Sequence, residues 1–156
     1  FTLQNLAGKT VTLHDYQGKV VALFFGYTHC PDVCPVTLQQ WAAIKEQLGE
    51  QGKRLQVLFV SVDPQRDTPE LLRAYVPQFD PDFDALTGSE QALQPLLKGL
   101  KVVSEKVEGS SPANYLMNHS SSVYVFDTHG RLRLLVRYNA ELQPVVRDIQ
   151  TLIDQA

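Results

Sequence analysis

The feature that most constrains this chain is a continuous apolar run at residues 20–25 that leads through a short turn into a helical pattern. A run rich in Val and Phe, with no polar alternation, is typical of a central strand buried on both faces. The turn, residues 26–35 with the sequence GYTHCPDVCP, holds both cysteines of the chain. Cysteine chemistry is therefore concentrated at one strand-to-helix junction.

Apolar period and turn residues predict the other elements. Strands are expected at 1–3 and 11–13 around Asn5 and Gly8, at 55–62, at 102–107, and at 121–127 and 132–137 around the turn 128–130. Helices are expected from Pro35 to about 51 with Cys34 as cap and 30–33 as an irregular turn, from Pro69 to about 79 with Thr68 as cap, from the cap Ser89 to about 99, and at 142–153. Residues 108–118 are expected to form a loop.

This order predicts an α/β thioredoxin-like fold with a central mixed sheet, flanking helices and an N-terminal β-hairpin. The length of 156 residues fits a single domain over residues 1–156. A net charge of -3 without a basic stripe argues against nucleic acid as a partner. No apolar run approaches the roughly 20 residues that cross a bilayer, so we expect a processed or truncated soluble domain whose membrane anchor, if any, is absent from this chain.

The two cysteines, Cys30 and Cys34, have three residues between them, one more than in a thioredoxin dithiol. Thiol exchange and soft-metal binding both fit such a pair. A structural disulfide is the weaker reading, because closing so small a loop restricts the unfolded chain little. A neighbouring helix N-terminus favours thiolate and so helps both chemistries alike.

Four stretches of the chain form one set. They are GYTHCPDVCP at 26–35, SVDPQRDTP at 61–69, FDPDF with LTG at 79–83 and 86–88, and NHS at 118–120 before the strand YVFD at 124–127. Together they resemble the Sco/SenC family, the copper proteins needed to assemble cytochrome c oxidase. The resemblance spans nearly the whole chain, and its cysteine stretch is specific. One position departs from the family, because Asn118 stands where an Asp usually precedes the histidine.

The resemblance implies that Cys30, Cys34 and His119 bind copper. Two thiolates suit Cu(I), and an imidazole suits both Cu(I) and Cu(II), so this set can hold both oxidation states. A three-ligand site with an open edge also lets a partner's thiol or imidazole enter and remove the metal. Cys30 and Cys34 are at the same time the candidate redox-active thiols.

The leading interpretation is a copper chaperone that serves the binuclear copper centre of cytochrome c oxidase, or first reduces the cysteines of that centre. The alternative is a thiol-disulfide oxidoreductase for which copper is incidental. A peroxidase ranks third, since Thr28 directly precedes His29 and Cys30 and no upstream Pro builds a peroxide pocket.

The implied partners are the copper-bearing oxidase subunit and a copper donor chaperone. We expect a monomer on the periplasmic side of a bacterial inner membrane, with the mitochondrial intermembrane space as second choice. Its contact with the membrane would be made only through an anchor outside this chain.

The other candidate ligands favour structural interpretations. His29 is expected in an exposed turn, and His14 and His129 on the surface. Met117 is expected to pack, as single methionines usually do. The acidic stretch 63–68 is expected to end a strand and begin a helix rather than bind a metal.

Overall fold

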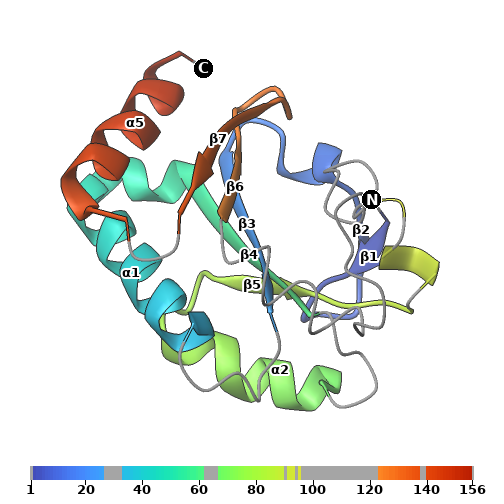
Figure 1. Cartoon of the computed structure of the whole chain (residues 1–156). Coiled ribbons are helices and arrows are strands. Elements are labelled where there is room, and N and C mark those ends of the chain that lie inside the picture. Colours follow the sequence, from blue (N-terminus) through green and yellow to red (C-terminus); the bar gives the residue numbers. More distant parts are fainter. Residues whose placement is uncertain are drawn as a thin grey trace, which may run out of the picture.

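A central sheet covered on both faces organises the chain (Figure 1). The computed structural model describes residues 2–26, 33–61, 67–89, 91–93, 95, 123–137 and 140–155, with only the backbone for 33 and 34. The strands are β1 (Leu3–Gln4), β2 (Thr10–Val11), β3 (Val20–Gly26), β4 (Leu55–Ser61), β5 (Asp84–Leu86), β6 (Val123–Phe126) and β7 (Leu132–Val136). The α-helices are α1 (Val33–Leu48), α2 (Pro69–Tyr75) and α5 (Leu142–Asp154), and the 3-10 helices are η1 (Leu13–Tyr16), η2 (Gly49–Arg54) and η3 (Val76–Gln78).

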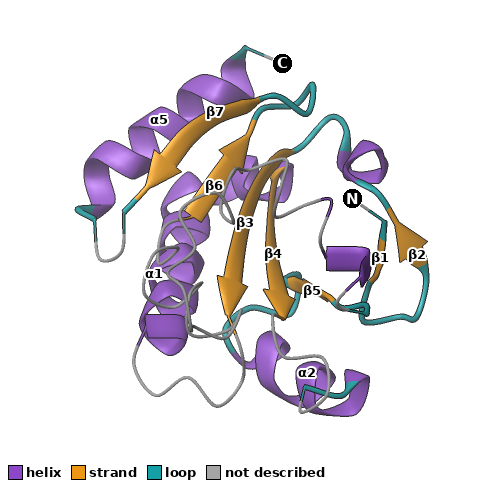
Figure 2. Cartoon of the chain, turned by 45° about the vertical axis from the view of Figure 1, so that its right-hand side comes forward, coloured by secondary structure: helices purple, strands orange, loops and turns teal. Residues whose placement is uncertain are grey.

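The main sheet is mixed, and its strand order is β5-β4-β3-β6-β7 (Figure 2). β3 runs parallel to β4, which runs parallel to β5, whereas β6 is antiparallel to β3 and to β7. β1 and β2 form a separate antiparallel hairpin. The predicted thioredoxin-like fold, with its mixed sheet and N-terminal hairpin, is therefore confirmed.

The central strand β3 is buried along its whole length, as its uniform apolar run predicted. Alternate side chains of β3 face two different apolar clusters. Helices α1, α2 and α5 cover one face, while the N-terminal hairpin packs on the other (Figure 1). On the helical face an edge-to-face series of rings joins Phe24, Phe59, Tyr75 and Phe79, with centroids 5.3, 6.0 and 5.4 Å apart. This packing fixes β3 between its two neighbours, and so fixes the point at which the cysteine stretch leaves the sheet.

The start of α1 differs from the prediction. The helix begins at Val33, so Cys34 is its second residue rather than its cap, and Pro35 is the third. The predicted irregular turn was wrong for Val33, and residues 30–32 lie outside the described part of the chain. Proline is tolerated there because the first N–H groups of a helix have no intrahelical acceptor to lose. At the other end, Gly49 with φ +60° ends the α-helix as expected.

Several other predictions are confirmed with shifted bounds. The Thr68 hydroxyl accepts a hydrogen bond from the Leu71 amide at 3.2 Å, and Ser89 caps in the same way toward Ala92 at 3.1 Å. The α2 helix is shorter than expected and continues as η3. The predicted strand 102–107, the loop 108–118 and the end of the third helix lie outside the described residues. Strand β5 was not predicted, because its three residues are too few for a periodicity signal.

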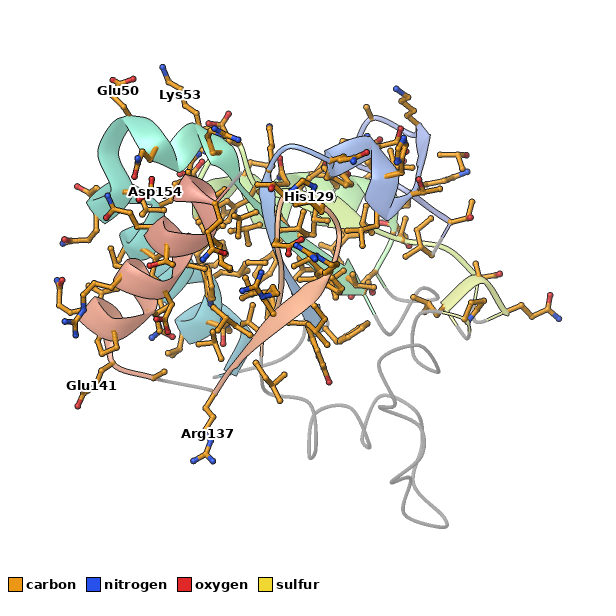
Figure 3. The ribbon with its side chains drawn as sticks, turned by 90° about the horizontal axis from the view of Figure 1, so that it is seen from above. Glu50, Lys53, His129, Arg137, Glu141 and Asp154 are labelled. Carbon is orange, nitrogen blue, oxygen red and sulfur yellow. The ribbon has the colours of Figure 1, made fainter. Side chains whose placement is uncertain are left out.

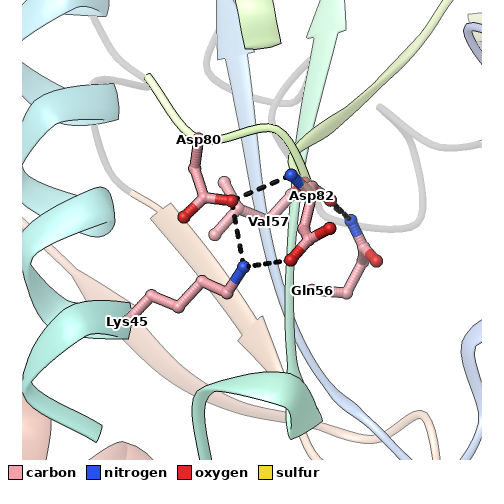
Figure 4. Close-up of polar contacts among 5 residues, drawn as sticks. All are labelled: Lys45, Gln56, Val57, Asp80 and Asp82. Carbon is pink, nitrogen blue, oxygen red and sulfur yellow. Dashed lines mark hydrogen bonds and ion pairs between the residues drawn. The ribbon is translucent and has the colours of Figure 1, made fainter. Parts of the chain in front are cut away.

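A cluster of charged side chains connects α1 to the turn before β5 (Figure 4). The Lys45 ammonium lies 2.9 Å from the Asp80 carboxylate and 2.8 Å from that of Asp82. The Gln56 amide donates to the Asp82 carbonyl at 3.0 Å. Desolvation alone would lower the pKa of Lys45, but the hydrogen bonds to Asp82 and Asp80 outweigh it and raise that pKa. The cluster therefore holds α1 beside the sheet as a charged network.

Replacing Lys45 by Met should lower the free energy of unfolding by about 1–2 kcal/mol, because it leaves the half-buried Asp80 without its ammonium partner. Lys53→Met is the matched control, since Lys53 pairs with Glu50 at 3.3 Å where both side chains are largely exposed (Figure 3). Its expected cost is below about 0.5 kcal/mol. Urea unfolding of the two variants makes the comparison, and equal losses would show that the Lys45 cluster contributes no more than a surface pair.

Candidate functional site

The two central strands end side by side at one end of the sheet. Gly26, the last residue of β3, is in register with Ser61, the last residue of β4. The chain leaves Gly26 into residues 27–32 and returns at Val33, where α1 begins. The carboxyl ends of parallel strands are where α/β folds place their functional loops. The cysteine stretch therefore leaves the sheet at the end where function is expected.

The predicted site residues fall mostly outside the described part of the chain. Cys30 and His119 both lie there, as do His29, Met117 and Asn118. For Cys34 the backbone is described, and it places this residue in the first turn of the 16-residue helix α1. The partial positive charge of a helix N-terminus favours an anionic neighbour, and therefore thiolate over thiol.

The strand that follows His119 enters the sheet at the same end. β6 begins at Val123 and runs antiparallel to β3, with Leu23 opposite Tyr124. Because the two strands are antiparallel neighbours, the start of β6 lies beside the last residues of β3. Phe25 and Tyr124 make an edge-to-face contact there, with ring centroids 5.8 Å apart. The segment that follows β3 and the segment that precedes β6 are thus attached to adjacent strands at the same end of the sheet.

A buried polar pair supports the same end of the sheet. The Ser61 hydroxyl donates to the Asp67 carboxylate at 2.7 Å, and both residues are fully buried. With Thr68 capping α2, this agrees with the structural interpretation of Asp67 and Thr68. Thr37, which was not among the predicted site residues, lies one turn after Cys34 and is buried. Its hydroxyl makes no hydrogen bond within the described residues. The sequence signal that could have identified Thr37 was its place in the predicted helix, three residues after a cysteine.

The two described histidines lie away from this end. His14 and His129 are exposed, as predicted, and line one pocket with Leu13, Gln17 and Gly130. That pocket lies beside the β6–β7 turn, at the opposite end of β6 from Val123. Among the residues with described side chains, no group of three or more His, Cys, Asp or Glu could hold a metal ion.

Electrostatics at the β6–β7 turn are organised by a buried carboxylate, that of Asp127. It accepts backbone N–H groups of His129 at 2.9 Å and of Arg131 at 3.0 Å. It also accepts the Arg131 Nε–H at 3.1 Å and the Arg133 guanidinium at 3.3 Å. Burial alone would raise the pKa of Asp127, but these hydrogen bonds and the Arg131 charge lower it to about 2. The turn therefore needs an ionised Asp127.

Asp127→Asn should lower the free energy of unfolding by about 1–3 kcal/mol at neutral pH, since a neutral amide replaces an acceptor of four donors. Because folding lowers the pKa from 3.8 to about 2, the stabilisation is complete above about pH 4 and is lost as the pH falls toward 2. The stability gap between wild type and variant should narrow over that range, with exposed Asp148→Asn as control. A gap that stays constant in urea unfolding from pH 6 to pH 2.5 would contradict this account.

In the described part of the chain, no helix combines the length and apolarity needed to cross a membrane. A mixed sheet with helices on one face, a hairpin on the other and a cysteine stretch between β3 and α1 defines a thioredoxin-like α/β protein. Comparison with known proteins narrows this class. The SCO1/SenC family matches residues 1–154. The chain therefore belongs to the SCO1/SenC family.

The relatives agree in sequence and in structure. A SCO2-like protein of Rickettsia felis is 34% identical over 132 residues, which are 84% of this chain and 64% of that protein. The chain thus spans less than two thirds of that relative's length. ScoI of Bradyrhizobium japonicum, solved with copper bound, is 32% identical with a TM-score of 0.80, covering 97% of this chain and 96% of that one. BsSco belongs to the Sco family of cytochrome c oxidase assembly proteins, and a disulfide switch has been identified in it. It is 26% identical with a TM-score of 0.74, covering 100% of this chain and 92% of that one.

Proposed function

We propose that this chain is a copper chaperone that assists assembly of the binuclear copper site of cytochrome c oxidase. The observation that carries the proposal is the likeness, over nearly the whole chain, to a Sco protein with copper bound. The cysteine pair supports it, because Cys30 follows the buried strand β3 in sequence and Cys34 belongs to the first turn of α1. Copper is here the cargo, and the chain supplies its ligands and its release.

The proposed ligands are Cys30, Cys34 and His119. Chain geometry supports their meeting. Cys30 is four residues after Gly26 (30 − 26), and His119 is four residues before Val123 (123 − 119). Four residues span at most about 14 Å. Both short segments start from adjacent strands at one end of the sheet, so the three side chains are within reach of one another.

The ligand chemistry supports a site that binds and releases. Thiolates hold Cu(I) strongly, while the imidazole extends binding to Cu(II). Three protein ligands leave a coordination position at which an acceptor's thiolate can enter before the donor's thiolates leave. Metal can then pass without ever being free in solution.

The second candidate is a thiol-disulfide oxidoreductase that keeps the partner's cysteines reduced. The disulfide switch described for BsSco favours keeping it. In this reaction a Cys30 or Cys34 thiolate attacks the partner's disulfide, and the other cysteine resolves the mixed disulfide. The partner gains two electrons and two protons, and the chain becomes the Cys30–Cys34 disulfide.

A transfer experiment separates the two functions. The reduced chain, loaded with one equivalent of Cu(I), is mixed with the soluble copper domain of an oxidase subunit whose cysteines are already reduced. A chaperone moves copper to that domain, measured as its copper content after separation. The copper-free chain is then mixed with the same domain in its disulfide form, and new thiols are counted. Transfer without disulfide reduction supports the chaperone; reduction without transfer overturns it in favour of the reductase.

The partner and the place of action follow from this proposal. The copper-bearing oxidase subunit is the acceptor, and a separate copper donor loads the chain. Rickettsial and mitochondrial relatives are consistent with work outside the cytoplasm or in the intermembrane space. We propose the periplasmic side of a bacterial inner membrane.

A further inference from the structure

β7 is the edge strand of the main sheet, and it presents an unusual mixture of side chains to solvent. In the strand order it pairs with β6 on one side, and within the described residues no strand pairs with its other side. Leu132 and Leu135 are 48% and 60% exposed, the two most exposed large apolar residues described. Natural sheets usually protect such an edge, because its free N–H and C=O groups can pair with another chain.

The two leucines lie on one face of the strand. Leu135 is opposite Tyr124, and Leu132 is opposite Phe126 across a register shift. Directly opposed residues of antiparallel strands project to the same face, and Tyr124 and Phe126 belong to one apolar cluster. The exposed leucines therefore lie on the same face of the sheet as that cluster.

Three arginines flank the leucines. Arg131 and Arg133 are 67% and 40% exposed, and Arg137 projects outward at the end of β7 (Figure 3). The Asp127 carboxylate offsets one of these charges and orients two of the guanidiniums through its contacts at 3.1 and 3.3 Å. Two net positive charges thus remain on this edge of a chain whose overall charge is -3.

We propose that residues 131–137, the β7 edge, are a docking surface for an extended, acidic segment of a partner protein. Along the edge that no described strand pairs with, the strand offers main-chain hydrogen bonds, the two leucines offer apolar contact on one face, and the arginines favour carboxylates. A second copy of this chain fits poorly, because pairing β7 with β7 would oppose arginine to arginine. A lipid surface fits poorly too, since it has no main chain to satisfy the strand's polar groups.

The place of this edge relates it to the cysteine stretch. Val136 is opposite Val123, the first residue of β6, so β7 runs toward the end of the sheet where β3 also ends. A segment bound along β7 is thereby directed past Arg137 toward that end. The docking surface stands on β7 alone and does not depend on copper binding.

The test uses the reduced, copper-free chain and a fluorescein-labelled peptide of nine alternating Val and Glu residues. Fluorescence anisotropy should show saturable binding that weakens with salt, and the matching Val–Lys peptide should bind at least about tenfold more weakly. Amide shifts in NMR spectra should change at 131–137. Because copper is absent, failure here leaves the copper proposal intact, and failure of copper binding leaves this result intact.

Two pairs of variants locate the surface. Arg137→Glu should weaken the Val–Glu peptide about fivefold or more, while Arg147→Glu, the same change on exposed α5, should alter it less than about twofold. Leu135→Ser should weaken it by about fivefold, and Leu71→Ser, at a 38% exposed residue on α2, should not. All four positions are exposed, so unfolding midpoints should stay close to wild type.

Several outcomes would overturn the proposal. Equal binding of the Glu and Lys peptides would remove the charge argument, and equal effects of Arg137→Glu and Arg147→Glu would remove the location. Sedimentation showing a dimer that Leu135→Ser dissolves would assign the edge to a second copy. Binding to phosphatidylglycerol vesicles, without binding to the Val–Glu peptide, would assign it to a lipid surface.

Discussion

Replacing either Cys30 or Cys34 by Ala should remove tight Cu(I) binding by the reduced chain. Each change leaves one thiolate and one imidazole, and a soft monovalent ion loses its preferred donor. Removing a residue that only hydrogen-bonds to a metal ligand lowers metal affinity by about 10- to 100-fold, so removing a ligand itself should lower it by at least about 100-fold. Competition with a coloured Cu(I) chelator measures the effect.

The third proposed ligand should behave differently. His119→Ala leaves both thiolates, so Cu(II) affinity should fall more than Cu(I) affinity. His129→Ala is the matched control, because His129 is exposed at the opposite end of β6 and should leave both affinities unchanged. If all three ligand variants kept the affinity of wild type, the proposed site would be wrong.

Much of this fold is readable in the sequence because its strongest signals are local. The apolar run of β3 predicts a strand buried on both faces, and Thr68 before Pro69 predicts the start of α2. Gly130, with φ +80°, marks the β6–β7 turn. Each of these features depends on neighbours within a few residues, so a single sequence carries it.

The features that sequence reasoning missed depend on distant partners or on the exact position of a residue within its element. β5 is three residues long and exists because β4 pairs with it in register. The first residue of α1 was misplaced by two positions, because proline lowers helix propensity in general but not at a position whose N–H has no acceptor. Leu132 and Leu135 are three residues apart, so simple strand alternation would place them on opposite faces. They share a face because the pairing of β6 and β7 shifts register between Val125 and Phe126.

The candidate site divides in the same way. Residue type and family resemblance suggest the copper ligands, because thiolate and imidazole groups can be recognised as metal ligands from the sequence alone. The proposal that His119 reaches a cysteine pair 85 residues earlier (119 − 34) rests on the antiparallel pairing of β3 and β6. That pairing joins distant parts of the chain, so a sequence argument includes it only through the predicted fold.

Oxidising Cys30 and Cys34 to a disulfide should abolish copper binding by the otherwise unchanged chain. The ligand is the thiolate, and both sulfur atoms lose their negative charge when they bond to each other. Affinity for Cu(I) should fall at least about 100-fold and return on reduction. Loading the reduced chain should also release protons, because metal replaces those still bound to the ligands.

This prediction has an internal control. The double variant Cys30→Ala/Cys34→Ala should show the same weak copper binding before and after treatment with oxidant, whereas wild type should change. Free thiols are counted beside copper content at each step, so that copper lost per disulfide formed is measured directly. One copper lost per disulfide means that the two chemistries compete for the same two sulfur atoms, and a chain that carries copper cannot reduce its partner at the same time. Copper retained by the fully oxidised chain would place the metal elsewhere, and the cysteines would then serve thiol exchange alone.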